Sequence, residues 1–514
     1  MLRARALRFS TRSRPCGLRI PNIISPLWKH SNIDNSRYIS TTINDVADFS
    51  LTPTLGKIVD SNGVHGEPVK LSGHIRTCRT MKKMSFVDIS DGASSAVLNV
   101  IFPGEDSIAN YNLKVGQSVE IYGEWRDSPV KQRLEIHCDP SQANHSVSII
   151  GQVPDRYPIQ KKATSLEFLR TLPTLRHRTR TLGQILRARS FIEGSLMDYF
   201  RREDFIKVSP PIISGSDCEG AGELFYVGST GKKNFFKKST YLTVSTQLHL
   251  EVLSAALNRV WTMTPCFRAE NSDTTRHLSE FWMLEAEVAY VDDVRQLTTL
   301  CDNMLKSIVQ DMKSHKTFSS EMESSFPNED TMAKIKERWA TFENSNSSWP
   351  TITYSMALEI INDVQRADNS KKLEWGATLN TEHEKWLAGE YFKTPVFVTD
   401  YPSFQKPFYM RKSNPEIYDP EKPTVACFDL LIPEVGELIG GSLRIHDYDE
   451  LMEQIEERKM DKKALEWYIS LRRNGTVPHG GFGLGFERLV MYLSGTENIR
   501  DTIPFPRTPG HCQC

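Results

Sequence analysis

The stretch His479-Gly480-Gly481-Phe482-Gly483-Leu484-Gly485-Phe486-Glu487-Arg488-Leu489 lies close to the C-terminus of this 514-residue chain. Its alternating glycines remove most side-chain bulk from a predicted strand, so a ligand can lie against bare backbone. Apolar residues follow at helical spacing, so we expect the strand to run into a helix with Arg488 in its first turn. A helix N-terminus and a guanidinium both favour a polyphosphate. Gly-x-Gly-x-Gly alone is a weak nucleotide signal, and its spacing is not that of a dinucleotide-binding fold.

A second informative stretch runs from Phe267 to Val288, where two β-like segments flank a polar turn and predict a hairpin. Alternation places Arg268 and Glu270 on one face of the first strand, and Phe281 and Glu285 on one face of the second. A cation, an acceptor, an aromatic ring and a carboxylate then converge on one surface, which is the set of groups that ATP requires. A surface hairpin with solvated charges is the alternative, but it does not explain why both stretches suit one ligand.

Together the two stretches resemble motifs two and three of the class II aminoacyl-tRNA synthetases, and more closely the aspartyl, asparaginyl and lysyl branch. Three further segments make the asparaginyl-tRNA synthetases the most similar family: Arg472 to His479, Asn498 to Asp501, and Pro504 to Arg507. The resemblance extends from about residue 55 to the C-terminus. It implies an α+β fold, in which an N-terminal OB-fold β-barrel is joined to a class II catalytic domain with an antiparallel sheet flanked by helices.

The length of the chain predicts at least two domains. With the resemblance, we expect a mitochondrial presequence over residues 1–40, an OB-fold anticodon-binding domain over 50–148, a hinge over 149–182 and the catalytic domain over 183–514. Short strands with turn signals between about residues 50 and 148 independently predict a barrel of about five strands.

The N-terminal segment has the composition of a targeting sequence. Six arginines precede the first acidic residue, Asp34, and lie among Ser and apolar residues: Arg3, Arg5, Arg8, Arg12, Arg14 and Arg19. An Arg-rich, acid-free, Ser-containing segment predicts a presequence that ends between Arg37 and Thr41, and therefore a location in the mitochondrial matrix. A basic arm that binds RNA is the alternative.

Overall composition narrows the classes of partner. The net charge is −1, so there is no global basic signature and any nucleic-acid surface must be local. The nine cysteines are odd in number and lack a C-x-x-C pair, so we expect reduced thiols. No apolar stretch approaches the length needed to span a membrane, so no membrane contact is expected.

The predicted barrel carries Phe86 among Arg76, Arg79, Lys82 and Lys83, the aromatic and basic combination that binds single-stranded nucleic acid. A plain β-domain with Phe86 in its core fits the pattern equally well. In the family that the chain resembles, this barrel reads the anticodon. The matching positions here are Arg79, Phe86, Asn99 and Glu135, with Asn99 at a position where aspartyl relatives carry Gln.

Two segments precede the predicted active site. Basic side chains in the hinge either contact tRNA phosphates or belong to a solvated linker: Lys161, Lys162, Arg176, His177, Arg178 and Arg180. Helical spacing from Thr181 to Arg202, a short strand and Pro211 then resemble motif one, the dimer interface of the class, although a plain core helix would look the same. We therefore expect a homodimer through the helix and strand that end at Pro211.

The reaction implied by the resemblance uses ATP and Mg²⁺ to convert asparagine to its adenylate, and then transfers the asparaginyl group to tRNA(Asn). Adenylate formation needs charge neutralisation and positioning more than a protein base. The residues expected to act in it fall into three groups. Those for ATP are Arg268, Glu270, His277, Phe281, Glu437 and Arg488, with Arg268 and Arg488 as catalytic cations. Those for the amino acid are Glu219, Gln247, Glu285 and Arg444. Those for magnesium are Asp429 and Glu437.

The choice of amino acid has a physical argument of its own. A carboxamide needs one acceptor and one donor, which Glu285 and Arg444 supply. Aspartyl relatives carry Asp at the position of Glu285 and Lys at the position of Leu250, so both departures disfavour aspartate. A wrongly paired buried group costs about 1–3 kcal/mol, so two mismatches give strong discrimination. Simple packing of a helix is the alternative reading of Leu250.

The leading hypothesis is thus asparagine activation and transfer to tRNA for mitochondrial translation. Three alternatives stay open: an aspartyl or relaxed-specificity synthetase, a synthetase-like RNA-binding protein without catalysis, and tRNA-independent asparagine synthesis on the same fold. Intact Arg268, Glu437 and Arg488 argue against a protein without catalysis. The barrel argues against asparagine synthesis.

Overall fold

The computed structural model describes residues 51–104, 107–128, 134–160, 164–215, 224–229, 235–326, 329–343, 348–364, 372–414 and 419–514. The expected presequence over 1–40, the hinge lysines Lys161 and Lys162, and the expected amino-acid ligand Glu219 lie outside these residues. Nothing in the structure tests them.

The N-terminal domain is a closed barrel in which β1 pairs with both β2 and β4. Its strands number six rather than about five, in the order β1-β2-β3-β5-β4-β6. They are β1 (Pro68–Met81), β2 (Met84–Ser90), β3 (Leu98–Pro103), β4 (Ser118–Asp127), β5 (Leu134–His137) and β6 (Ser146–Gly151), with the short helices α1 (Leu55–Asp60) and α2 (Ser107–Asn110). Alternation buries Val87 and Ile89 in the core and leaves Phe86, which precedes Val87, half-buried on the outer surface. Phe86 is therefore not a core residue.

The catalytic domain is built on an eight-stranded sheet of order β12-β13-β14-β15-β16-β11-β10-β7. The strands are β7 (Ile206–Lys207), β10 (Arg259–Phe267), β11 (Glu280–Ala289), β12 (Thr351–Thr353), β13 (Val396–Thr399), β14 (Cys427–Ile432), β15 (Gly436–Leu443) and β16 (His479–Gly485). The strands between β13 and β10 are antiparallel, and the two edge strands β12 and β7 add parallel pairings. The expected α+β architecture is confirmed.

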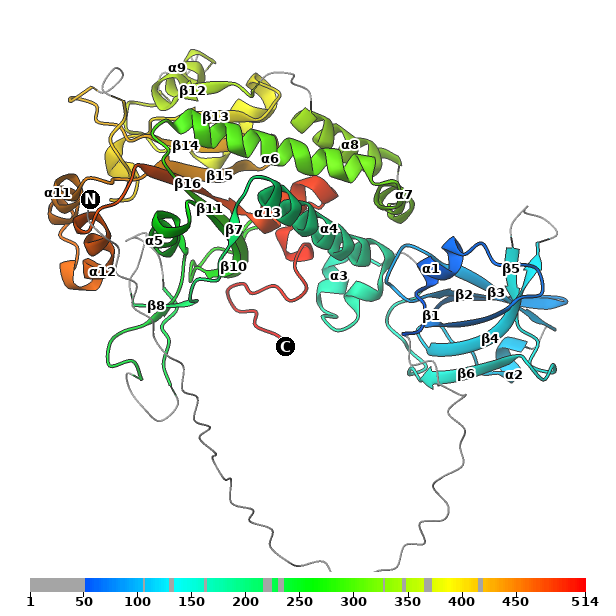
Figure 1. The fold of residues 1–514 in the computed structure, drawn as a ribbon. Coiled ribbons are helices and arrows are strands. Elements are labelled where there is room, and N and C mark those ends of the chain that lie inside the picture. The colour runs from blue at the N-terminus through cyan, green and yellow to red at the C-terminus, as the bar shows by residue number, and fades with distance from the viewer. Residues whose placement is uncertain are drawn as a thin grey trace, which may run out of the picture. The chain divides into compact units, whose positions relative to one another are not determined.

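Helices cover the sheet, as Figure 1 shows. The long helix α6 packs against β14, β15 and β16, whereas α5 packs against β10, β11 and β16. The helices are α3 (Leu166–Arg170), α4 (Arg180–Arg202), α5 (Gln247–Leu257), α6 (Val294–Ser314), α7 (Lys316–Ser325), α8 (Glu329–Glu343), α9 (Tyr354–Val364), α10 (Thr381–Trp386), α11 (Tyr448–Glu457), α12 (Lys462–Arg473) and α13 (Phe486–Ser494). The remaining elements are a small pair of strands, β8 (Ile213–Ser214) and β9 (Tyr241–Leu242), and the single turns η2 (Arg176–Arg178), η4 (Leu387–Tyr391), η5 (Ser403–Gln405) and η6 (Ile499–Asp501).

The glycines of strand β16 meet different neighbours on the two faces of the sheet. A Cβ on Gly480 would lie 3.0 Å from Leu297 of α6, on the apolar face. A Cβ on Gly481 would point to the other face and lie 2.0 Å from the carboxylate oxygen of Glu287. The glycine at 481 is therefore required by a buried acid of the protein itself. The strand runs directly into α13, as the sequence predicts, and this helix ends at Gly495 in the left-handed conformation.

One hinge residue departs from its expectation. Arg176 is only 1% exposed and donates hydrogen bonds to the backbone carbonyls of Arg500, Ile503 and Pro504. It also pairs with the buried carboxylate of Asp501 at 3.4 Å. Arg176 is thus wrong as a tRNA phosphate contact, because its guanidinium fixes the C-terminal segment instead.

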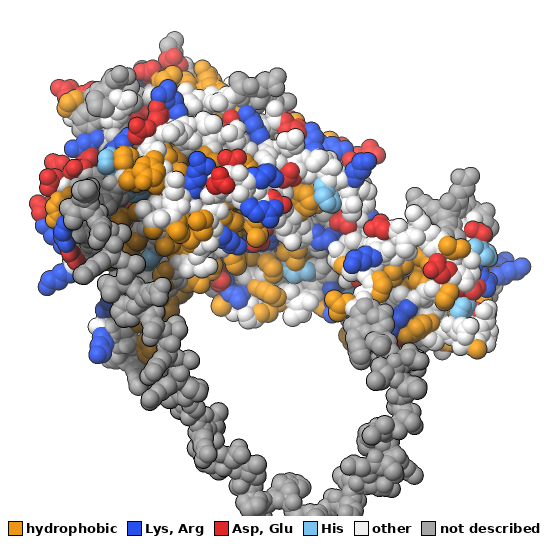
Figure 2. Space-filling view, viewed as in Figure 1, with side chains coloured by type: hydrophobic (Ala, Val, Ile, Leu, Met, Phe, Trp, Pro, Cys, Tyr) orange, Lys and Arg blue, Asp and Glu red, His pale blue; other side chains and the backbone are white. Residues whose placement is uncertain are grey.

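The surface agrees with the near-zero net charge. On the face seen in Figure 2, acidic and basic side chains are interspersed, with groups of apolar side chains between them. Among the described helices, none has both the length and the apolar composition required to cross a bilayer. The described cysteines are free thiols: Cys78, Cys138, Cys266, Cys301, Cys427, Cys512 and Cys514.

Candidate active site

A cavity of about 260 Å³ opens on the face of the sheet opposite α6, beside Gly440, Gly441 and Gly483. It is walled by the β10–β11 hairpin, by β14, β15 and β16, and by the first turn of α5. Six of the residues singled out from the sequence line it together: Gln247, Arg268, Glu285, Asp429, Glu437 and Arg444. Leu250 is buried and also lines it. Residues from four distant segments therefore meet at one place.

Glu285 lies in the cavity wall as a buried, well-held carboxylate. It accepts hydrogen bonds from the hydroxyl of Ser245 at 2.5 Å, from the hydroxyl of Thr246 at 2.5 Å, and from the backbone N–H of Thr246, which reaches both carboxylate oxygens at 3.1 and 2.9 Å. These donors are all uncharged. The described contacts therefore hold the carboxylate in place without neutralising its charge.

Arg444 is fixed by Glu287, two residues along β11 from Glu285. Its Nε and Nη2 donate to the two carboxylate oxygens at 3.1 and 2.9 Å, and its Nη1 donates to the hydroxyl of Ser442 at 2.6 Å. Burial opposes the charge on Arg444, but the ionised Glu287 outweighs it and raises the pKa of the guanidinium. Three of its five N–H groups are used, so two are left for a ligand.

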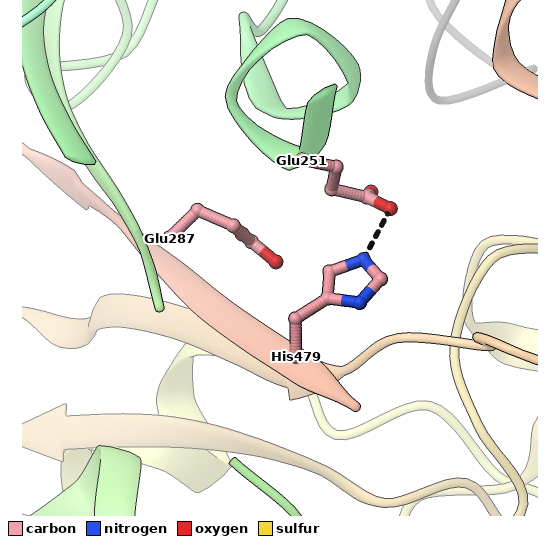
Figure 3. Close-up of side chains that lie close together, drawn as sticks. All are labelled: Glu251, Glu287 and His479. Carbon is pink, nitrogen blue, oxygen red and sulfur yellow. Dashed lines mark hydrogen bonds and ion pairs between the residues drawn. The ribbon is translucent and has the colours of Figure 1, made fainter. Parts of the chain in front are cut away.

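A second group of buried charges lies next to this ion pair. Glu251 of α5, Glu287 of β11 and His479 of β16 bring one oxygen or nitrogen each within 4.8 Å of one another (Figure 3). Arg444 already occupies Glu287, and Arg472 donates to Glu251 at 2.6 Å. Because two arginines balance the two carboxylates, we read the cluster as a charge network of the protein and not as a metal centre.

Further cations and an aromatic ring lie beside Arg268 and Glu437 of the cavity lining, whereas Glu270, His277, Phe281 and Arg488 are not among the described residues that line it. The guanidinium of Arg268 lies 5.6 Å from the ring centroid of Phe281. Arg488, in the first turn of α13, donates to the backbone carbonyl of Glu437 at 2.8 Å. The Nδ1 of His277, in the turn of the hairpin, is hydrogen-bonded to the hydroxyls of Ser272 and Thr274 at 3.0 and 2.6 Å.

The surroundings of His277 set its charge. Burial and the nearby Arg488 lower the pKa of His277, so its imidazole is neutral near pH 7. Glu270 is half-buried in the same loop, and its negative charge is close enough to raise the pKa of His277 in part. Arg268 and Glu270 both follow the end of β10 and do not lie within the strand, because β10 ends at Phe267.

Carboxylates suited to a divalent cation lie beside Gly440. Oxygens of Glu437 and Asp429 are 3.1 and 3.4 Å from the position that a Cβ of Gly440 would take, so both face the same space. Asp429 is also paired with Lys406 at 2.7 Å. A third carboxylate, Glu384 of α10, accepts from the backbone N–H of Glu437 at 3.2 Å. Burial and Glu437 raise the pKa of Glu384 to about 7.

The expected anticodon residues lie on one outer surface of the barrel. Arg79 and Phe86 are opposite each other in the β1–β2 register, with the guanidinium 5.9 Å from the ring centroid. Asn99 donates to Asp88 at 2.7 Å, and Glu135 accepts from Ser128 at 2.7 Å. The ring of Phe86 is half-buried and lies beside Arg79, which is the arrangement expected where a base stacks on an aromatic side chain.

The sequence analysis did not identify the residues that form ion pairs or hydrogen bonds with the predicted site residues. Glu287 shares a strand face with Glu285, so alternation gave a usable signal for it. Lys406, Glu384 and Glu251 come from other segments, and no spacing pattern connects them to their partners. Only the fold brings these distant segments next to the site.

Comparisons with known proteins agree with this geometry. A family model described as tRNA synthetases class II (D, K and N) matches residues 165–509, and one for an OB-fold nucleic acid binding domain matches residues 69–140. The chain is 46% identical over 464 residues to the mitochondrial asparagine–tRNA ligase of Saccharomyces cerevisiae, covering 86% of this chain and 92% of the yeast protein. It is 40% identical to the mitochondrial asparagine–tRNA ligase of Schizosaccharomyces pombe, covering 90% and 98%. It superposes on asparaginyl-tRNA synthetase from Pyrococcus horikoshii, solved with asparaginyl-adenylate, with a TM-score of 0.75, 32% identity, and coverage of 87% and 96%.

Proposed function

Since the chain belongs to the class II tRNA synthetases of the aspartate, lysine and asparagine branch, we propose that it is an asparagine–tRNA ligase whose cavity beside the glycine strand activates asparagine. ATP is the second substrate of that step, and tRNA(Asn) receives the product. The relatives named mitochondrial in two yeasts support a mitochondrial role, and the Arg-rich N-terminus supports delivery to the matrix.

One observation carries the choice of amino acid: Glu285 lines the cavity as a buried carboxylate, and all its described donors are uncharged. A carboxamide N–H can donate to it, and the two unused N–H groups of Arg444 can donate to the carboxamide oxygen. An aspartate carboxylate would place a second negative charge against Glu285. Leu250 supplies no cation to offset that charge, so the cavity favours asparagine.

Adenylate formation follows from the groups beside Arg268 and Glu437 of the cavity lining. The asparagine carboxylate forms a bond to the α-phosphorus of ATP as the bond to pyrophosphate breaks. Arg268 neutralises charge at the α-phosphate, and Phe281 stacks on adenine with Glu270 as an acceptor for its amino group. Arg488 and the neutral His277 hold the distal phosphates. The residues act by positioning and charge neutralisation, and no side chain has to take up a proton.

Magnesium fits the carboxylate pair beside Gly440. Hard oxygen ligands and substrate phosphates are what Mg²⁺ prefers, and Asp429 and Glu437 offer such oxygens toward one space. When bound, the ion neutralises the phosphates and orients them. Glu384 adds a third carboxylate next to Glu437, and Lys406 holds Asp429 in place through an ion pair.

The barrel and the dimer complete the proposal. The surface of Arg79, Phe86, Asn99 and Glu135 is proposed to contact the anticodon. Large apolar side chains are exposed on α4 and β7, and at and just before β8 in the segment that follows Pro211: Met197, Ile206, Ile212 and Ile213. Such exposure supports a homodimer through this segment. Sedimentation of the purified chain checks it, since a monomer at micromolar concentration would contradict the proposal.

The test of function is pyrophosphate exchange by the full-length chain with each amino acid in turn. We expect exchange with asparagine and at most background exchange with aspartate. Arg488→Ala should abolish exchange without unfolding the protein. Arg473→Ala is the matched control, because Arg473 pairs only with Glu466 among described surface acids and both are about half exposed. Exchange with aspartate alone, or full activity of Arg488→Ala, would refute the assignment.

A further inference from the structure

Glu251 is a fully buried carboxylate of α5 that accepts hydrogen bonds from four separate side chains. Its Oε2 receives Arg472 at 2.6 Å, Tyr468 at 2.8 Å and His479 at 3.0 Å. Its Oε1 receives the amide Nε2 of Gln247 at 3.1 Å. Figure 3 shows Glu251 extending from α5 toward His479, with Glu287 beside them. The described contacts of Glu251 therefore join three elements below the cavity.

The partners of Glu251 leave it no freedom to rotate. Arg472, which is itself buried, also donates to the carbonyl of Ile445 at 2.9 Å and to the hydroxyl of Tyr468 at 2.8 Å. Burial alone would raise the pKa of Glu251, but Arg472 and His479 reverse the effect, and its pKa lies well below the usual range. Glu251 is consequently an ionised acceptor in a fixed place.

This fixed acceptor determines which way the amide of Gln247 points. A carboxylate can only accept, so the NH₂ of Gln247 has to face Glu251. The carbonyl oxygen lies on the opposite side of the same planar amide. Because Gln247 also lines the cavity and its Nε2 is taken by Glu251, the carbonyl oxygen is the polar atom of the amide that is left for a ligand.

We infer that Glu251 is a positioning residue for asparagine, which holds the Gln247 amide so that its oxygen accepts a hydrogen bond from an N–H group of the substrate. Asparagine has two such groups, the ammonium and the carboxamide. Without a fixed acceptor behind it, the amide of Gln247 can rotate by half a turn and present its NH₂ instead. The inference rests on the proposed function and adds a residue that never touches the substrate.

The test measures pyrophosphate exchange by the full-length chain with asparagine and ATP varied separately. Glu251→Gln offers Gln247 a donor as well as an acceptor, so the orientation of its amide is no longer set. We expect the KM for asparagine to rise about tenfold, the effect of one good hydrogen bond, while the KM for ATP stays unchanged. A positioning role also requires that, in a chain that already carries Gln247→Leu, Glu251→Gln cause no further rise in the KM for asparagine.

A reversed pair provides the second variant. Combining Glu251→Gln with Gln247→Glu lets the carboxylate at 247 accept from the amide at 251 and again turn an oxygen to the cavity. It also leaves the number of carboxylates at these two positions unchanged, so it tests the inference even if Glu251→Gln alone does not fold. We expect a KM for asparagine within about threefold of the parent, since the hydrogen bond is restored. A reversed pair as poor as Gln247→Leu, or additive effects of the two single changes, would overturn the inference.

Asp302→Asn is the matched control for loss of a buried acid. Asp302 is also buried on a helix and pairs with Lys306 four residues later at 2.8 Å, but it is not among the described residues lining the cavity. Its KM for asparagine should match the parent even if its thermal stability falls. A parent without asparagine-dependent exchange would instead refute the proposed function. Calorimetric titration of asparagine into the same variants would then decide the role of Glu251 by itself.

Discussion

Arg444 and Glu287 form a buried bidentate ion pair, from Nε to Oε1 at 3.1 Å and from Nη2 to Oε2 at 2.9 Å, with side chains 3% and 1% exposed. The pair turns the remaining N–H groups of Arg444 to the cavity. A strand with a side chain at position 481 would displace Glu287, so the pair depends on Gly481.

Glu287→Gln should destabilise the protein by about 3 kcal/mol, because removing one partner of a buried pair leaves an uncompensated charge. The midpoint of thermal unfolding measures the change. Glu323→Gln is the control, since the Glu323–Lys336 pair is more than half exposed and should be worth less than about 1 kcal/mol. Equal shifts for the two variants would mean that the buried pair contributes no more than a surface one.

Leu250→Lys should change the amino acid that is activated. A lysine at this buried position would lie in the cavity wall that also holds Glu285, and would offer a cation to a substrate carboxylate. We expect asparagine exchange to fall by about tenfold or more and aspartate exchange to become measurable, as a charged hydrogen bond is worth about 1.5–3 kcal/mol. Leu250→Met keeps the volume and should retain asparagine exchange. No gain with aspartate would favour a packing role for Leu250.

Glu384→Gln should separate stability from catalysis. The change removes one of three neighbouring carboxylates, so the metal-free protein should become more stable by about 1 kcal/mol. The same loss of negative charge should raise the Mg²⁺ concentration needed for half-maximal exchange. Titration of Mg²⁺ and a melting curve in EDTA measure the two effects. An unchanged Mg²⁺ requirement would place Glu384 outside the metal environment.

Phe86→Ala should weaken tRNA use and leave the first step intact. Removing a stacked base contact costs about 1–3 kcal/mol, so the KM for tRNA in aminoacylation should rise by about tenfold. Pyrophosphate exchange in the absence of tRNA should not change, because Phe86 belongs to the barrel and not to the cavity. Tyr122→Ala, another partly exposed aromatic of the barrel, is the control. A loss in both assays would point to a folding defect.

Local patterns predicted the elements that carry the site. The hairpin of β10 and β11, the glycine strand that runs into α13, and the barrel all follow from alternation, helical spacing and turn residues within short windows. The pattern left open whether Phe86 belongs to the core of the barrel, and the structure places it on the outer surface. The family expected from these motifs is confirmed by the match over residues 165–509. Glu285 and Arg444 line one cavity, as the carboxamide argument requires.

The partners of these residues could not be predicted, because they are distant in the chain. Arg444 and Glu287 are 157 positions apart, and Tyr468 and Glu251 are 217 apart. Sequence spacing carries no information at that range. The same limit explains the error at Arg176, where a run of basic residues suggested a solvated or RNA-contacting surface. Its carbonyl acceptors lie more than 300 positions away.

The attachment of Arg176 to residues 500–504 has a consequence for the order of synthesis. The hinge is made before most of the catalytic domain, and the carbonyls that its buried guanidinium requires are made more than 300 residues later. Arg176 must therefore wait in water or with provisional partners until residues 500–504 have been made. A chain that stops short at residue 499 would leave this cation without its acceptors, so we expect prematurely terminated products to be recognised and degraded even though every residue lining the cavity is present.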